Sequence, residues 1–290
     1  MLDWDLVAVV AKVLLYATCL TASGGVLFMA IFGASLTGTE RLHIVRFTRA
    51  MAVAALVVSF ARVMILSGLL GGDLASLWDW SLIRIVIEGS EGQAAAVRAA
   101  GLIGIAAFSF GTGTTQAIAM LGALLAVGSF ALTGHTGSVG PGNVPRLLLA
   151  VHLLAVSYWI GALFPLFRLT SSLEFPRVGA ILRRFGNIAA VVVPSLIAAG
   201  LTLLWLLLGT VDAVFTSAYG SLVLLKLAFV AGLLTLAAVN KLRLTPGVEA
   251  GDRTAVARLR WSIAGEMALA GAILVVTATF TTVVGPPEPA

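Results

Sequence analysis

Eight long apolar stretches constrain the fold of this chain more than any other feature of its sequence. A helix rises about 1.5 Å per residue, so stretches of roughly 20 apolar residues can cross the roughly 30 Å hydrocarbon core of a bilayer. Hydrophobic residues make up 60% of the 290 residues and charged residues only 11%, whereas a soluble domain carries roughly 25% charged residues. The mean hydropathy is +1.07. The sequence therefore predicts an all-α polytopic membrane protein and excludes a soluble globular fold.

The apolar stretches predict an eight-helix transmembrane bundle. It forms one domain, residues 1–290, with spans at about 6–32, 50–70, 93–110, 115–132, 147–167, 185–208, 219–239 and 261–284. The third and fourth spans are separated only by residues 111–114, but together they are about twice as long as one crossing requires. The connection 71–92 contains Trp78, Trp80 and an apolar run. We expect this connection to lie on the outer membrane surface.

Basic residues are distributed unevenly between the two sets of connections. If the N-terminus lies outside, the outer connections hold only Arg84, Arg98 and Arg146. The inner connections then hold twelve basic residues: Arg41, Arg46, Arg49, Arg168, Arg177, Arg183, Arg184, Lys241, Arg243, Arg253, Arg258 and Arg260. Lys and Arg are enriched in cytoplasmic loops, so both termini are predicted on the periplasmic or exterior side. This topology explains the high isoelectric point without a nucleic-acid partner. Asp3 and Asp5, in place of basic residues, argue against a cleaved signal peptide.

Polar side chains within the spans are the first candidates for function, because each is costly in lipid. Most are predicted in the outer half of the bundle, where they would form an electropositive cavity: Lys12, Arg62, Lys226, His152 and, at the end of the fourth span, His135. For Lys12 and Lys226, extension of the long side chains to the outer interface is an equal alternative. Arg62 lies deeper, so we expect it to have a bonded partner inside the bundle.

Histidine and sulfur side chains supply the candidate metal ligands. His152 precedes Trp159 by seven residues, so the two share a helix face. The short Gly/Pro-rich connection from His135 can bring a second imidazole to the same cavity, which would make a partial metal site. Imidazole and thioether groups suit copper, and Met64 is the methionine placed nearest to His152. The alternatives are a hydrogen-bonding role for His152 and simple core packing for Met64 and Cys19.

Two further polar residues are predicted near the inner side. Glu266 is the only carboxylate within a span and lies near the inner end of the eighth helix. Roughly 12 Å or more along the membrane normal would separate it from Lys226. We therefore expect no salt bridge between them, and expect Glu266 to bond Asn240, Lys241 or a nearby basic residue. His43 lies among arginines, whose field disfavours a bound cation.

Several segments resemble the copper resistance protein D (CopD) family. The stretch HLLAVSYWIGALFPL at 152–166 is similar to the family's His-then-Trp-Ile-Gly helix, and Thr133-Gly134-His135 is similar to the Gly-His that ends its preceding helix. Leu149 departs from the family, whose members often carry a polar or acidic residue there. The similarity continues at Leu224-Leu225-Lys226, 237–241, Thr245-Pro246, Ser262 to Glu266 and Gly285-Pro286-Pro287, and residues 1–99 match only in hydropathy.

The resemblance implies an inner-membrane, multi-pass protein that handles copper and receives it from a small periplasmic copper-binding (CopC-like) protein. It also implies that the protein moves copper across the membrane, and both import and export remain open. The positions at which the resemblance implies a functional role are His135, His152, Trp159, Lys226, Asn240 and Glu266. No nucleotide-binding motif is present, so transport would be passive or driven by an ion or the membrane potential, and a transporter is expected rather than an enzyme. The electropositive outer cavity is an objection to a cation path.

Two alternatives remain open at this point. Membrane proteins of related helical arrangement bind haem, and histidines flanked by Lys and Arg would suit an iron ligand with propionate partners. A haem-binding redox protein or haem-dependent enzyme is therefore one alternative. A structural or sensing subunit without transport is the other.

Overall fold

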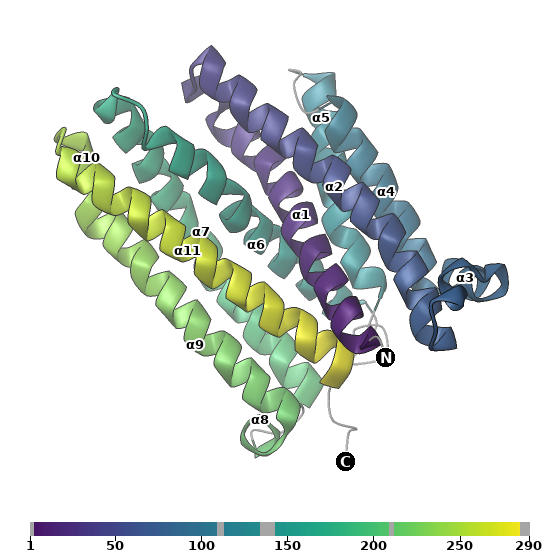
Figure 1. The fold of residues 1–290 in the computed structure, drawn as a ribbon. Coiled ribbons are helices and arrows are strands. Elements are labelled where there is room, and N and C mark those ends of the chain that lie inside the picture. The colour runs from purple at the N-terminus through teal and green to yellow at the C-terminus, as the bar shows by residue number, and fades with distance from the viewer. Residues whose placement is uncertain (1–2, 109–112, 134–142, 209–211, 285–290) are drawn as a thin grey trace.

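The computed structural model describes residues 3–108, 113–133, 143–208 and 212–284, which form a bundle of helices without strands (Figure 1). The long helices are α1 (Trp4–Phe32), α2 (Gly38–Gly71), α4 (Ser90–Phe108), α5 (Thr114–Gly128), α6 (Val144–Leu169), α7 (Phe175–Leu208), α9 (Ala218–Val239) and α11 (Arg253–Thr279). The short helices are α3 (Trp80–Glu88), α8 (Asp212–Thr216) and α10 (Thr245–Glu249). Single 3-10 turns are η1 (Gly33–Ser35), η2 (Ala75–Trp78) and η3 (Ser129–Leu132), and π-helical turns are η5 (Asn240–Leu244) and η6 (Phe280–Val284).

Seven helices of the described residues are long and apolar enough to cross a membrane. They are Trp4–Ser35, Gly38–Gly71, Thr114–Leu132, Val144–Leu169, Phe175–Leu207, Ala218–Glu249 and Arg253–Val284. The remaining long helix, α4, is absent from this set, because Glu91, Gln93 and Arg98 lower the hydropathy of its 19 residues. The protein is therefore all-helical with seven candidate spans by length and composition, one fewer than the sequence predicted.

Successive long helices run in opposite directions, so their ends gather at two ends of the bundle (Figure 1). At the terminal end, where α1 begins and η6 ends, Lys12 Nζ donates to the Thr281 carbonyl at 2.9 Å and Trp4 Nε1 to the Gly72 carbonyl at 3.1 Å. At the opposite, basic end, the Arg177 guanidinium binds Glu40 at 2.8 Å. The twelve basic residues predicted on one side of the membrane lie on the parts of α2, α6, α7, η5 and α11 toward the basic end.

Two helices begin well before the predicted spans. α2 starts at Gly38 rather than near residue 50, because Thr37 and Glu40 form a capping box in which each side chain accepts from the other's backbone N–H. α7 starts at Phe175 rather than near residue 185, with Pro176 in its first turn, where a missing N–H costs nothing. Much of the connections predicted at 33–49 and 168–184 is thus helical.

Small residues let α6 pack closely on α1. A Cβ added to Gly161 would lie 2.3 Å from the Gly24 Cα, and one added to Gly24 would lie 1.8 Å from the Ser157 carbonyl oxygen. Lipid supplies little hydrophobic drive between helices, so close backbone approach through glycines is a main source of packing energy. This contact places α6 between α1 and α7 (Figure 1).

The connection predicted to lie on the outer surface contains η2 and α3. Trp78 and Trp80 are 75% and 70% exposed, whereas Ile83 and Val86 face the bundle and are buried. Before them, the Ser76 hydroxyl and backbone N–H donate to Asp73, and these bonds hold the pKa of Asp73 below its ordinary value. The segment is thus a tight cap over the end of α2, with its tryptophans exposed.

Candidate functional site

His152 lies in α6 toward the terminal end and is held by α7. Its Nδ1 lies 3.2 Å from the Leu196 carbonyl oxygen. A carbonyl only accepts, so Nδ1 carries the hydrogen and Nε2 keeps the lone pair that a metal requires. Gly200, one turn after Leu196, makes room for the ring, because a Cβ there would lie 3.2 Å from His152 Cε1.

This arrangement supplies the support that Leu149 cannot give. Histidine ligands usually donate their second ring N–H to a carboxylate or a carbonyl, which fixes the tautomer and the ring orientation. Here the Leu196 carbonyl takes that role from α7, a helix that sequence reasoning did not connect with His152. The side chain can therefore act as a neutral, oriented nitrogen donor.

A lysine stands beside this imidazole. Lys226 of α9 is close enough for its charge to act on His152. Its Nζ also lies 5.5 Å from the centre of the Phe280 ring in η6, within the range of a cation–π contact. The surroundings of His152 thus include a cation, as the sequence predicted for this end of the bundle.

A second polar group lies two turns along α6 and farther from the terminal end. The buried Glu266 of α11 accepts from Trp159 Nε1 at 3.2 Å and from Asn240 Nδ2 at 2.6 Å. Asn240 was one of the partners that the sequence analysis expected for Glu266, and Trp159 was not. Asn240 begins the π turn η5, which Thr245 closes by donating to the Asn240 carbonyl. No salt bridge joins Glu266 to Lys226 among the described residues, in agreement with the prediction.

Arg62 has the bonded partner that its depth required. Its Nη2 lies 3.3 Å from Glu91 Oε1, at the start of α4, and only 6% of Arg62 is exposed. Glu91 was assigned to a surface connection, so the sequence did not identify this pair. Lys12 is close enough to both to interact with them electrostatically.

The structure corrects the predicted position of Arg98. It was counted among the residues of the outer connections, but it lies inside α4 with 2% of its surface exposed. Its Nε donates to Ser129 Oγ at 3.0 Å and its guanidinium lies 4.5 Å from the centre of the Phe130 ring. A hydroxyl and an aromatic face therefore compensate a charge that the sequence placed in water.

The other predicted ligands are not brought to His152 within the described residues. His135 lies outside the described residues. Met64 is on α2, which packs mainly on α1 and α4, whereas His152 faces α7. His43 is exposed near the basic end, and Cys19 is buried in α1. Within residues 3–108, 113–133, 143–208 and 212–284, no three His, Cys, Asp or Glu side chains gather into a metal-binding group.

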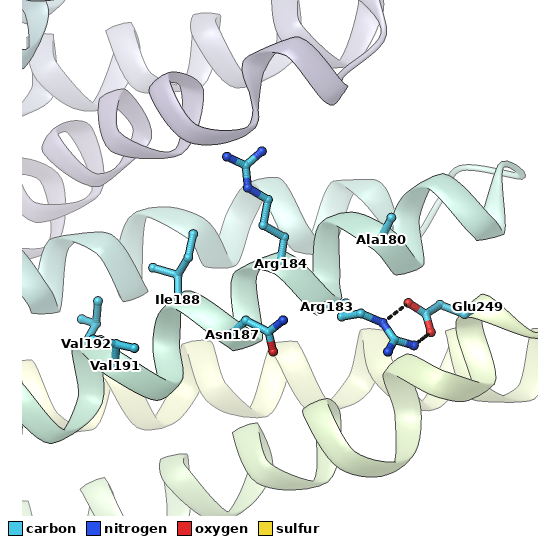
Figure 2. A pocket seen from close by; sticks show the side chains of 8 residues that line it. All are labelled: Ala180, Arg183, Arg184, Asn187, Ile188, Val191, Val192 and Glu249. Carbon is cyan, nitrogen blue, oxygen red and sulfur yellow. Dashed lines mark hydrogen bonds and ion pairs between the residues drawn. The ribbon is translucent and has the colours of Figure 1, made fainter.

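An open groove of about 750 Å³ follows α7 from the basic end. Figure 2 shows Arg183 paired with Glu249 of α10 on one side of the groove and Arg184 directed toward α1 on the other. The groove continues along Asn187, Ile188, Val191 and Val192. Val192 lies one turn before Leu196, so the groove ends near the part of α7 that holds His152.

Comparison with known proteins identifies the family. The chain matches two family models, "Copper resistance protein D" over residues 179–280 and "Copper resistance protein D-like, N-terminal domain" over residues 1–142. It is 32% identical over 187 residues to the "Copper transport protein CutJ" of Bacillus subtilis (strain 168). These aligned residues cover 63% of this chain and 32% of the relative. The match thus spans about a third of that relative's length.

No solved structure matches the chain significantly. The segment 152–166, on which the family resemblance was first noted, lies between the two matched regions and inside α6. Matches on both sides of α6, together with the copper transport relative, lead to one conclusion: the chain belongs to the copper resistance protein D family.

Proposed function

We propose that this protein accepts copper at His152 and moves it across the membrane. Its membership of a copper resistance family makes it a copper-handling, multi-pass membrane protein. The observation that carries the finer proposal is the bond from His152 Nδ1 to the Leu196 carbonyl, because it leaves Nε2 oriented and available to a metal ion. His135 is proposed as a second ligand.

The proposed orientation places the terminal end in the periplasm. The basic end carries the excess of Lys and Arg that is typical of the cytoplasmic side. We propose that α4 also crosses the bilayer, which makes eight spans, because its 19 residues reach about 28 Å at about 1.5 Å per residue. In this arrangement in the bacterial inner membrane, η2 and α3, with Trp78 and Trp80, lie on the outer surface.

The proposed route follows α6 and α7 toward the basic end. His152 and Trp159 share one face of α6, and Trp159 leads to the Glu266–Asn240 pair. The groove along α7 opens at the basic end (Figure 2). Copper would enter from a CopC-like periplasmic protein. The sequence contains no nucleotide-binding motif, so the movement would be passive or driven by an ion gradient or the membrane potential.

The direct test is copper binding by purified variants. We expect His152→Ala to bind less than half as much copper per protein as the wild type, measured by elemental analysis after dialysis. His43→Ala is the matched control, since His43 is exposed near the basic end, and it should bind as the wild type does. Equal copper in all three proteins would contradict a copper site at His152.

Haem binding is the competing proposal, favoured by the cations Lys226, Lys12 and Arg62 at the same end as His152. Such cations would suit haem propionates. A visible spectrum of the purified protein separates the two proposals. A Soret band that disappears in His152→Ala would support haem, and copper without a Soret band would support the copper site.

A further inference from the structure

Three cationic side chains from three helices converge at the terminal end of the bundle. Lys12 comes from α1, Arg62 from α2 and Arg98 from α4. Lys12 and Arg98 are each close enough to Arg62 and Glu91 to interact with both electrostatically. Arg62 and Arg98 are 6% and 2% exposed, so bulk water screens their charges poorly.

The charges of this cluster do not balance among the described residues. Glu91 is the one carboxylate that pairs with Arg62. Lys12 donates to a backbone carbonyl, and Arg98 contacts the Ser129 hydroxyl and the Phe130 ring, all of which are neutral. Three cations and one carboxylate leave an excess of two positive charges. Buried charges without a counter-charge are strongly unfavourable.

One hydrogen-bond donor of the cluster has no acceptor among the described residues. Arg62 Nη2 faces Glu91, but Arg62 Nη1 is fully buried and has no hydrogen-bond partner among the described residues. A guanidinium presents its donors in a fixed fork that matches anionic acceptors. An unpartnered, buried N–H of a cation is therefore directed at the position where an anionic acceptor would be most stabilised.

The cluster also has an approach from outside the bundle. A pocket of about 240 Å³ lies between α2, α3 and α4 and is lined by Leu66, Ile85, Ser90 and Glu91, among others. Glu91 thus faces the pocket while it binds Arg62, and 34% of its side chain is exposed. A small solute or a lipid headgroup can therefore reach Glu91, the partner of Arg62, from this pocket.

We propose that Lys12, Arg62 and Arg98 form a binding site for a small anionic group, such as chloride or a phosphate. The anion would accept from Arg62 Nη1 and offset the positive excess, while Glu91 competes with it for Arg62. Through η6, which contacts both Lys12 and Lys226, the same anion would lower the positive field at the entrance to His152. The binding of the anion itself does not depend on copper.

The test measures the thermal unfolding midpoint of the full chain in detergent with sodium chloride, and with sodium gluconate at equal ionic strength. Chloride should raise the midpoint of the wild type. Arg62→Gln combined with Glu91→Gln removes the pair without leaving a lone carboxylate, and should weaken chloride binding about tenfold. Glu91→Gln alone should bind chloride about threefold more tightly, because it removes a competing negative charge. Arg84→Gln disrupts an exposed arginine–glutamate pair, and should respond as the wild type does.

A second arm identifies the source of the anion. The same proteins are compared in nanodiscs of phosphatidylglycerol and of phosphatidylcholine without chloride. Stabilisation by phosphatidylglycerol that disappears in the double variant assigns the site to a lipid phosphate, and stabilisation by chloride alone assigns it to a free anion. A wild type that responds to neither, a double variant that responds fully, or weaker binding by Glu91→Gln would overturn the proposal.

Discussion

His152 and Glu266 are the two polar groups on which the proposed route depends, and each is bonded differently. His152 uses one ring nitrogen on a backbone carbonyl, and its other ring nitrogen has no hydrogen-bond partner among the described residues. Glu266 has both carboxylate oxygens occupied, by Trp159 and Asn240. The first is therefore suited to bind an incoming ion. The second ties α6, η5 and α11 together, and any ligand must displace a hydrogen bond to reach its carboxylate.

Trp159→Phe is expected to lower the free energy of unfolding by about 1 kcal/mol, because a buried carboxylate oxygen loses its donor. Trp205→Phe is the matched control, since Trp205 is 60% exposed on α7 and should lose almost nothing. Thermal or denaturant unfolding in detergent measures both. Similar losses for the two variants would show that the Trp159 bond adds little.

Lys226 and Glu266 should act independently. Lys226 neighbours His152 and Phe280, whereas Glu266 bonds Trp159 and Asn240, so the two share no partner. In a double-mutant cycle of Lys226→Met and Glu266→Gln, the coupling energy should stay within about 0.5 kcal/mol. Coupling above about 1 kcal/mol would mean that the two side chains meet in the working protein.

The sequence predicted some of the contacts between individual residues and missed others for a physical reason. Depth along each helix was enough to separate Glu266 from Lys226 and to include Asn240 among its three expected kinds of partner, but not to choose between them. The Arg62–Glu91 and His152–Leu196 contacts depend on the rotation of each helix about its axis. Glu91 also lies where a connection becomes a helix, and a carbonyl acceptor carries no side-chain signal in the sequence.

Two kinds of local sequence signal predict each helix: apolar length gives its membrane-spanning part, and capping residues give its ends. Apolar length located the membrane-spanning part of each, but the ends required cap chemistry. The Thr37-x-x-Glu40 pattern marks the start of α2 in the sequence, before the apolar stretch begins. The glycines Gly24 and Gly161 could not be paired from the sequence, because many glycines occupy the spans and only packing shows which ones meet.

Gly161→Ala tests the close contact of α6 with α1. The added methyl group would lie 2.3 Å from the Gly24 backbone, so the helices must separate, at a cost of about 1–3 kcal/mol in the free energy of unfolding. Gly271→Ala adds the same methyl group to α11 with no atom within 4 Å, and should be neutral or stabilising by up to about 1 kcal/mol. Unfolding in detergent gives both values, and equal effects would contradict the tight α1–α6 contact.

For the whole molecule, hydropathy predicted a helical membrane bundle, and the distribution of Lys and Arg predicted that basic residues group at one end. Hydropathy was least decisive about the number of membrane-spanning helices. In α4, Glu91 pairs with Arg62 of α2 and Arg98 donates to the Ser129 hydroxyl, so the hydropathy of this helix understates how well it is accommodated in the bundle. Hydropathy treats each residue as if it were exposed to lipid. It cannot register a buried charge that neighbouring helices compensate.

The orientation of the bundle is tested with reporter fusions. A reporter fused after Arg258, at the basic end of α11, is expected to read as cytoplasmic, and one fused at Ala290 as periplasmic. Both readings follow from the excess of basic residues at one end. The reverse pattern would place His152 in the cytoplasmic half of the membrane.

Copper flux into proteoliposomes tests the central claim most directly. The protein is reconstituted as the wild type, His152→Ala and His43→Ala, and copper inside the vesicles is measured over time with a membrane potential of either sign. We predict that wild type and His43→Ala move copper faster than protein-free vesicles under at least one sign of the potential, and that His152→Ala does not. Equal flux in wild-type and protein-free vesicles, or full flux in His152→Ala, would contradict transport through His152.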